Sequence, residues 1–275
     1  MTAMSYGELL AEARKDVDAA IEVWRQLIHE RLSDRVEYAL LKGSGIKEWE
    51  SPVDYVPVIS DIDIHVGTKK GMPLFQENRE GFLCSLETTR LYEEMFKEKR
   101  PDHLHIPRPQ IMVVKENRGD WLPESPAEFK PLYGEVPLKP EEPEESLRAR
   151  DLEELAGLAP LLARLPEYVI ERIDLEYYRV LRMLCWVVSP TPVRVLSQYT
   201  DPKHAWTLNR TKALRLLERS GLREIAEPYR EYYLTGWKAF TEGFRGNETM
   251  RQLITHAYEV LYASYEAVRE KVEQR

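Results

Sequence analysis

Residues 36–66 read VEYALLKGSGIKEWESPVDYVPVISDIDIHV, and this stretch decides the fold of the first half of the chain. It predicts two strands. Residues 36–41 form a short apolar run, and residues 58–66 alternate apolar and polar side chains, as a half-buried strand does. The turn Gly43-Ser44 follows the first strand, and the second strand carries Asp61 and Asp63.

The spacing of Asp61 and Asp63 places both carboxylates on one face of the second strand, because side chains two residues apart in a strand point the same way. Two carboxylates on a strand otherwise rich in Ile and Val repel each other and lose solvation. A divalent cation is the usual compensation. On its own, the pattern is explained equally well by ordinary aspartates on a solvent-facing edge strand.

The turn Gly43-Ser44 makes the pattern more specific. A turn of this kind exposes backbone N–H groups and a hydroxyl, which can bind phosphate oxygens. Taken alone, it is also compatible with a plain turn. A strand that ends in Gly-Ser, followed shortly by a strand with Ser-Asp-x-Asp, is more informative than either half.

The composition favours small substrates. The chain of 275 residues carries a formal net charge of −8, and its isoelectric point is near 5.5. Proteins that bind long nucleic acids usually present a basic surface, because neutralising phosphates supplies most of their affinity. We therefore expect no polynucleotide partner. The first residues contain no apolar run, so we expect no signal peptide. No apolar run in the sequence is long enough to span a membrane, and we expect a cytoplasmic protein with no membrane partner.

The rest of the sequence separates into two parts of different character. A capping box at Ser5-Tyr-Gly-Glu8 predicts a helix to about residue 32. Residues 77–99 are predicted to form a helix, and residues 110–115 a third strand. The buried side of this helix is predicted to consist of Phe82, Leu83, Leu86, Leu91 and Met95.

Prolines cluster between residues 122 and 145, and the sequence beyond them is helical in pattern. We predict an α+β protein in three parts. Residues 1–121 form a domain with a small mixed sheet and helices, residues 122–145 a proline-rich linker, and residues 146–275 an all-helical bundle domain that covers or binds the substrate.

Over about residues 30–120, these motifs resemble the signature of the polymerase-β-type nucleotidyltransferase superfamily. That signature is an apolar residue, Gly-Gly or Gly-Ser, a spacer, and Asp-x-Asp or Asp-x-Glu among apolar residues. Here it stands as Leu40-Leu41-Lys42-Gly43-Ser44 and Ser60-Asp61-Ile62-Asp63-Ile64. The spacer, residues 45–60, is longer than is typical, and we interpret the extra length as a small loop insertion.

The resemblance implies a mechanism and a set of site residues. Asp61 and Asp63 would hold two Mg²⁺ ions against a nucleotide triphosphate, while Gly43 and Ser44 would bind its β and γ phosphates. Lys42 is a candidate phosphate contact. A substrate hydroxyl would attack the α-phosphorus, the nucleoside monophosphate would be transferred, and pyrophosphate would leave.

The sequence departs from this pattern at the third carboxylate. The superfamily usually has an acid near the start of the next central strand, where this chain has Gln110. Glu116, Asp102 and His65 are the other candidates for a third ligand or a general base. Either the site uses two carboxylates and another ligand, or the domain binds nucleotide without catalysis.

The second half resembles the helical domain of aminoglycoside adenylyltransferases, through Leu181-Arg-Met-Leu-Cys-Trp, Lys203-His-Ala-Trp206 and Asn209-Arg210. By this resemblance, Lys203 would contact phosphate, and Trp206 and Arg210 would line an acceptor pocket. Packing of these apolar and aromatic residues in the core of a helix bundle is the competing interpretation.

The leading hypothesis is a Mg²⁺-dependent nucleotidyltransferase that transfers AMP from ATP, or a nucleotide from another triphosphate, to a hydroxyl of a small molecule such as an aminoglycoside-like acceptor. A non-catalytic nucleotide-binding or interaction protein is the first alternative. A nucleotidyltransferase that modifies a protein or RNA is the second, although that class is usually a short stand-alone domain. We expect a monomer or a homodimer.

Overall fold

The structure is a computed structural model that describes residues 5–70, 72–114 and 122–274. The chain forms two compact units, which are described separately. The N-terminal unit comprises residues 1–48 and 60–141. The helical unit comprises residues 49–59 and 142–275. Helices and a mixed sheet occur together, in agreement with the predicted α+β class.

The N-terminal unit is built on a four-stranded sheet in the order β3-β2-β1-β4. Its strands are β1 (Val36–Lys42), β2 (Ile62–Thr68), β3 (Pro109–Val114) and β4 (Lys130–Tyr133). Strand β1 is antiparallel to both β2 and β4, whereas β2 and β3 are parallel. Because β2 and β3 are parallel, the chain must cross over between them, and helix α2 (Arg79–Lys99) lies in that crossover.

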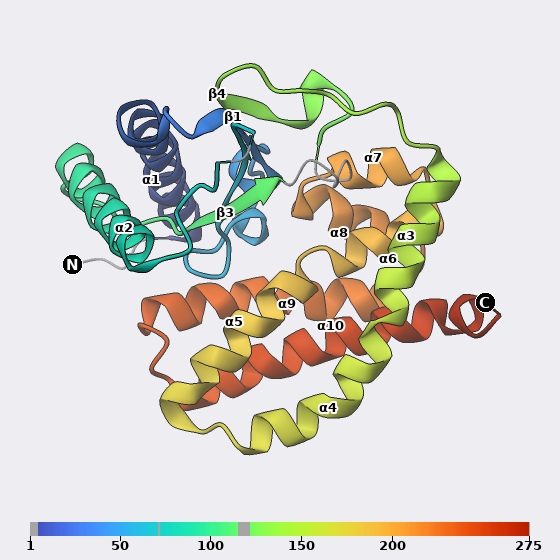
Figure 1. The fold of residues 1–275 in the computed structure, drawn as a ribbon. Coiled ribbons are helices and arrows are strands. Elements are labelled where there is room, and N and C mark those ends of the chain that lie inside the picture. Colours follow the sequence, from blue (N-terminus) through green and yellow to red (C-terminus); the bar gives the residue numbers. More distant parts are fainter. Residues whose placement is uncertain (1–4, 71, 115–121, 275) are drawn as a thin grey trace. The chain divides into compact units, whose positions relative to one another are not determined.

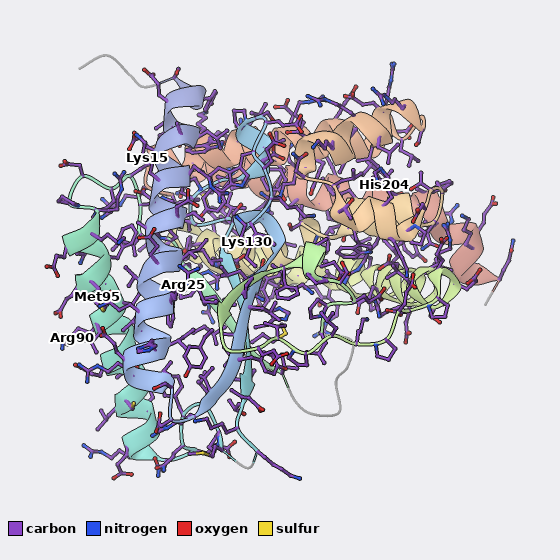
Figure 2. The ribbon with its side chains drawn as sticks, turned by 90° about the horizontal axis from the view of Figure 1, so that it is seen from above. Lys15, Arg25, Arg90, Met95, Lys130 and His204 are labelled. Carbon is purple, nitrogen blue, oxygen red and sulfur yellow. The ribbon has the colours of Figure 1, made fainter. Side chains whose placement is uncertain are left out.

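Helix α1 (Tyr6–Leu27) begins at the predicted capping box, in which Ser5 and Glu8 bond reciprocally, and continues as a π-helical turn (Ile28–Leu32). Helices α1 and α2 lie side by side next to the sheet (Figures 1 and 2). The rings of Trp24 and Tyr92 hold them together, with centroids 5.1 Å apart.

The predicted buried side of α2 was wrong for its first part. Phe82, Leu83 and Leu86 are exposed, and Leu91 and Met95 are half-buried. The buried aromatic residues are Tyr92 and Phe96. The apolar residues of this helix occupy more than one face, so periodicity alone gave the wrong phase. The aromatic contact with α1 decides which face is covered.

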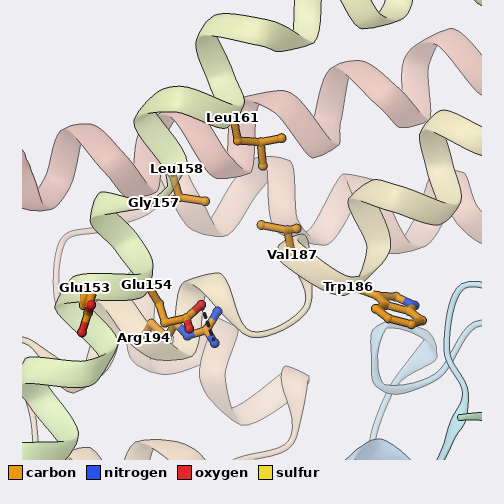
Figure 3. A pocket seen from close by; sticks show the side chains of 8 residues that line it. All are labelled: Glu153, Glu154, Gly157, Leu158, Leu161, Trp186, Val187 and Arg194. Atoms are coloured by element: carbon orange, nitrogen blue, oxygen red, sulfur yellow. Dashed lines mark ion pairs between the residues drawn. The ribbon is translucent and has the colours of Figure 1, made fainter. Parts of the chain in front are cut away.

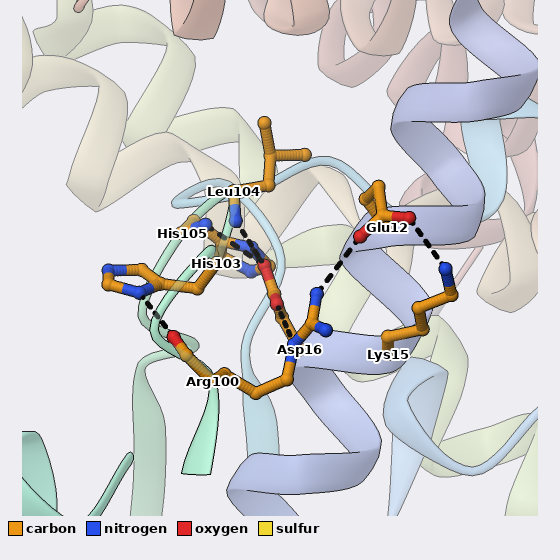
Figure 4. Close-up of polar contacts among 7 residues, drawn as sticks. All are labelled: Glu12, Lys15, Asp16, Arg100, His103, Leu104 and His105. Carbon is orange, nitrogen blue, oxygen red and sulfur yellow. Dashed lines mark hydrogen bonds and ion pairs between the residues drawn. The ribbon is translucent and has the colours of Figure 1, made fainter. Parts of the chain in front are cut away.

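A buried polar cluster fixes the chain that leads into β3 (Figure 4). Asp16 on α1 is fully buried, and its carboxylate accepts hydrogen bonds from the backbone N–H groups of Leu104 and His105, at 2.9 and 3.0 Å. The Arg100 guanidinium donates to it at 3.1 Å, and His105 Nδ1 lies 3.2 Å away. Because Asp16 joins α1 to residues 100–105, it holds the approach to β3 in place.

The same cluster shifts two pKa values. Burial lowers the pKa of His105, although the Asp16 carboxylate opposes this. Burial also disfavours the charged form of Asp16, but hydrogen bonds from His105 and Arg100 outweigh it and hold the Asp16 pKa below its usual value.

The helical unit contains α3 (Glu144–Ala156), α4 (Leu158–Ile170), α5 (Tyr177–Val188), α6 (Thr191–Ser197), α7 (Pro202–Thr207), α8 (Arg210–Arg219), α9 (Arg223–Thr241) and α10 (Asn247–Glu273) (Figure 1). Helices α9 and α10 pack extensively, and α9 buries Tyr229, Tyr232, Tyr233 and Trp237 along one side. These aromatic side chains lie in the core of the helical unit. Packing in a helix-bundle core was the competing interpretation for aromatic residues of this half. No helix in the described ranges is long and apolar enough to cross a membrane.

Three sequence-based boundaries differ from the structure. The predicted linker contributes β4, which pairs with β1, and residues up to 141 belong to the N-terminal unit. Strand β2 begins at Ile62 rather than residue 58, because residues 49–59 belong to the helical unit and Val58 adopts a left-handed φ of 71°. That backbone angle lies outside the β region that a regular strand requires.

Candidate functional site

The Gly43-Ser44 turn and the Asp63 carboxylate meet at one end of the sheet. Lys42, the last residue of β1, pairs with Asp63 on β2, so the turn at Gly43–Gly45 begins beside that carboxylate. Gly43 has a φ of 75°, and a Cβ added to it would overlap the Asp63 carboxylate. This position therefore requires glycine for two reasons, the backbone angle and the close approach.

The two aspartates share one face, as predicted. Asp61 lies immediately before β2 and Asp63 is the second residue of the strand, and both are partly exposed. Ile62 and Ile64, which alternate with them, are buried. The strand is therefore anchored by its apolar side chains, while its other face presents the carboxylates at the sheet end.

Gln110 lies directly beside Asp63. The parallel register of β2 and β3 pairs Asp63 with Gln110 and Ile62 with Pro109. Paired residues on neighbouring strands point to the same face, so the Gln110 amide belongs to the group formed by the two carboxylates. An amide oxygen is a neutral ligand and contributes less attraction for a cation than the carboxylate it replaces.

Arg108 is a site residue that the sequence analysis missed. Its guanidinium forms an ion pair with the Asp61 carboxylate through Nη2 and Oδ2. Its backbone oxygen accepts from Ile62 N at 3.0 Å, which continues the β2–β3 pairing by one residue. The sequence offered one indication of Arg108, its position two residues before Gln110 at the start of the third strand. Its contact with Asp61 follows only from the parallel register of β2 and β3.

The side chains at this end of the sheet are oxygen donors of the kind that Mg²⁺ prefers. Mg²⁺ is commonly held by one or two carboxylates, and waters and substrate phosphate oxygens fill its other positions. Asp61, Asp63 and the Gln110 amide supply such oxygen atoms at one end of the sheet.

The other candidates for the third ligand do not complete the set. In residues 5–70, 72–114 and 122–274, no group of three or more His, Cys, Asp and Glu side chains could hold a metal ion. Asp102 is exposed in the turn after α2, and His65 is buried in β2. Neither joins Asp61 and Asp63 in such a group, and Glu116 lies outside the described residues.

The spacer between the two motifs is not a small loop. Residues 49–59 pack within the helical unit, and Asp54 fixes them there with an exposure of 1%. Its carboxylate accepts from the N–H groups of Glu50 and Ser51 at 2.7 and 3.1 Å, and from Thr211 N and Oγ1 at 2.8 and 2.7 Å. Asp54 thus binds the N-terminus of α8, where free N–H groups favour an anion.

Further contacts hold this segment along its length. The Trp237 indole N–H donates to Pro52 O at 2.8 Å, and the Arg182 guanidinium donates to Val58 O at 2.6 Å. Gly236 leaves room for Ile59, because a Cβ on it would contact the Ile59 side chain at 2.5 Å.

Arg210 contacts other residues of the helical unit. Its guanidinium donates to Asp54 O at 2.8 Å and to Ser189 Oγ at 3.3 Å, and it lies over the Tyr233 ring at 4.3 Å. Trp206 donates from its indole N–H to Asp151 at 3.0 Å. Burial raises the pKa of the Asp151 carboxyl, although the Trp206 N–H opposes this. Lys203 is half-buried on α7.

A separate pocket of about 440 Å³ lies within the helical unit (Figure 3). Its lining combines aliphatic side chains, the indole of Trp186 and an ion pair between Arg194 and Glu154 at 3.3 Å. Burial lowers the pKa of Arg194. None of Lys203, Trp206 and Arg210 lines this pocket.

Comparison with known proteins found no match among protein-family models, curated proteins or solved structures. The functional assignment therefore rests on the chemistry and geometry of the site.

Proposed function

We propose that this chain is a Mg²⁺-dependent nucleotidyltransferase that transfers a nucleoside monophosphate, with ATP as the preferred donor, to a hydroxyl of a small molecule. The observation that carries the proposal is the junction of Gly43 with Asp63. A left-handed glycine opens a phosphate-binding turn, and its backbone lies against a carboxylate that shares a face with Asp61.

Each residue has a role in this proposal. The turn at Gly43 and Ser44 binds the β and γ phosphates, with Lys42 as a cationic contact. Asp61 and Asp63 hold the cation with help from the Gln110 amide oxygen. When bound, Mg²⁺ would neutralise charge on the triphosphate and polarise the α-phosphorus. The acceptor hydroxyl releases its proton to water as its oxygen forms a bond to that phosphorus. The bond from the phosphorus to the bridging oxygen breaks, and pyrophosphate leaves.

The acceptor is proposed to be a small molecule. The net charge of −8 is unfavourable for a polynucleotide and compatible with a cationic, aminoglycoside-like acceptor. For Lys203 and Trp206, the roles that the resemblance implies stay predictions. The contacts of Arg210 with Asp54, Ser189 and Tyr233 favour a structural role for that residue instead.

A nucleotide-binding protein without catalysis is the second candidate. It is supported by Gln110 beside Asp63 and by the ion pair of Arg108 with Asp61, because together they give the site less negative charge than three acids would.

Calorimetric titration with ATP and Mg²⁺ tests the binding that both candidates require. The wild type should bind, and the double variant Asp61→Ala, Asp63→Ala should lose at least about tenfold in affinity. Pyrophosphate release with a panel of hydroxylated acceptors then separates enzyme from binding protein. Absence of binding and turnover with every nucleoside triphosphate would reject both.

A further inference from the structure

The ion pair between Arg108 and Asp61 places a fixed positive charge at the proposed metal position. Asp61 has 15% of its side chain exposed and Arg108 has 34%, so water screens the pair only in part. The location of Arg108 is set by the sheet, because its backbone oxygen bonds Ile62 N beside Asp61. The arginine is therefore held next to the carboxylate rather than reaching it from a distant loop.

This arrangement acts against a free divalent cation. A cation that binds Asp61 competes for the carboxylate with the guanidinium, which bonds Oδ2, and it must also approach a positive charge nearby. Both effects weaken cation binding while the guanidinium remains in place. A triphosphate changes the balance, because its oxygens accept hydrogen bonds from arginine at least as well as a carboxylate does.

We propose that the ion pair with Arg108 weakens the binding of free divalent cations to Asp61. Asp61 becomes available to the cation when the Arg108 guanidinium binds a triphosphate instead. The inference rests on the proposed function and adds that tight binding of the cation requires the nucleotide. The cation and the nucleotide bind together, and the cation alone binds weakly. Arg108 is thereby a nucleotide contact and a determinant of metal affinity, without any role for it in bond making.

The test measures binding of Mn²⁺ alone, by electron paramagnetic resonance, to the full-length wild type and to Arg108→Gln. Loss of the guanidinium should tighten Mn²⁺ binding about tenfold, which corresponds to one charge-assisted hydrogen bond. Affinity for ATP without metal, measured by calorimetry, should fall by about the same factor. Adding Asp61→Ala to Arg108→Gln should remove the gain in Mn²⁺ affinity.

Arg90→Gln is the matched control. Arg90 forms ion pairs with Glu87 and Glu94 on the exposed surface of α2. Arg90→Gln therefore removes the same charge, and ion pairs with carboxylates, from the same unit. Its Mn²⁺ affinity should equal that of the wild type. If circular dichroism shows that Arg108→Gln does not fold, Arg108→Met provides the same test with an apolar side chain of similar length.

Unchanged or weaker Mn²⁺ binding in the folded Arg108 variant overturns the inference, even if the wild type binds ATP with Mg²⁺. Tighter Mn²⁺ binding with unchanged affinity for metal-free ATP also overturns it, because the guanidinium would then not pass to the triphosphate. If the wild type binds no nucleotide under any condition, the proposed function fails. The inference then fails with regard to the triphosphate, while the Mn²⁺ result still decides whether Arg108 excludes the cation.

Discussion

Substitution of Gly43 by alanine separates the two reasons for glycine at this position. At a φ of 75°, an alanine costs about 1–2 kcal/mol relative to glycine. Its Cβ would also overlap the end of the Asp63 side chain, which can rotate away at a cost of about 0.5–1.5 kcal/mol. We therefore expect Gly43→Ala to reduce the free energy of unfolding by about 1.5–3.5 kcal/mol and to displace the carboxylate from its position.

Gly221 provides a matched control for the backbone angle. Its φ is 77°, and no atom lies within 4 Å of an added Cβ. Gly221→Ala should therefore cost about 1–2 kcal/mol and leave Asp63 unaffected. Urea unfolding monitored by circular dichroism gives the stabilities, and calorimetric titration with ATP and Mg²⁺ gives the affinities.

The binding measurement is decisive for this prediction. Gly43→Ala should lose at least about tenfold in affinity for ATP with Mg²⁺, because a displaced ligand weakens a metal site by that order. Gly221→Ala should bind as the wild type does. If Gly43→Ala binds ATP with Mg²⁺ as tightly as Gly221→Ala, the contact between this glycine and Asp63 does not serve the site.

Three further predictions concern stability. Asp54→Ala should destabilise the helical unit by about 3–5 kcal/mol in urea unfolding, because three backbone N–H groups, one buried and two partly buried, lose their acceptor. Asp201→Ala, which removes a single exposed N-cap bond from α7, should cost about 1 kcal/mol, and equal losses would contradict this reasoning. Val58→Gly should raise the free energy of unfolding by about 0.5–1 kcal/mol, because glycine relieves a left-handed φ of 71°, and a lower melting temperature would argue against strain there. Burial lowers the pKa of His105 in the folded chain, so as pH falls the unfolded chain takes up a proton on this side chain before the folded chain does. The free energy of unfolding should therefore decrease as pH drops below the ordinary His pKa of 6.5. His105→Gln should flatten this dependence in urea titrations between about pH 7 and pH 5, and an unchanged slope would exclude His105 as its cause.

The features that the sequence predicted correctly are local ones. The run of apolar residues before Gly43 gave β1, and the alternation around Asp61 and Asp63 gave the shared face of the carboxylates. A strand and its turn are determined within a few residues by steric preference and by the period of two. The capping box at Ser5 is local in the same sense, since both of its hydrogen bonds join residues three apart.

The features that the sequence did not predict depend on contacts between segments that are distant along the chain. Arg108 meets Asp61 because β3 pairs with β2 in one particular parallel register, and nothing within either segment specifies that register. The phase of α2 depends on Trp24 of another helix. Gln110 could be placed from the sequence because the resemblance supplied the long-range pairing that the residues around it do not.

The segment 49–59 also bears on the choice between functions. It connects the Gly43 turn to Asp61, and its buried residues Tyr55 and Val56 pack within the helical unit, as does Asp54 through Thr211. Removal of residues 142–275 would expose these side chains and leave the Asp54 carboxylate without its partner on α8. The motif of this chain therefore depends on its helical unit for the position of its own spacer. This dependence supports the proposal of a protein with two units over the alternative of a minimal, stand-alone domain.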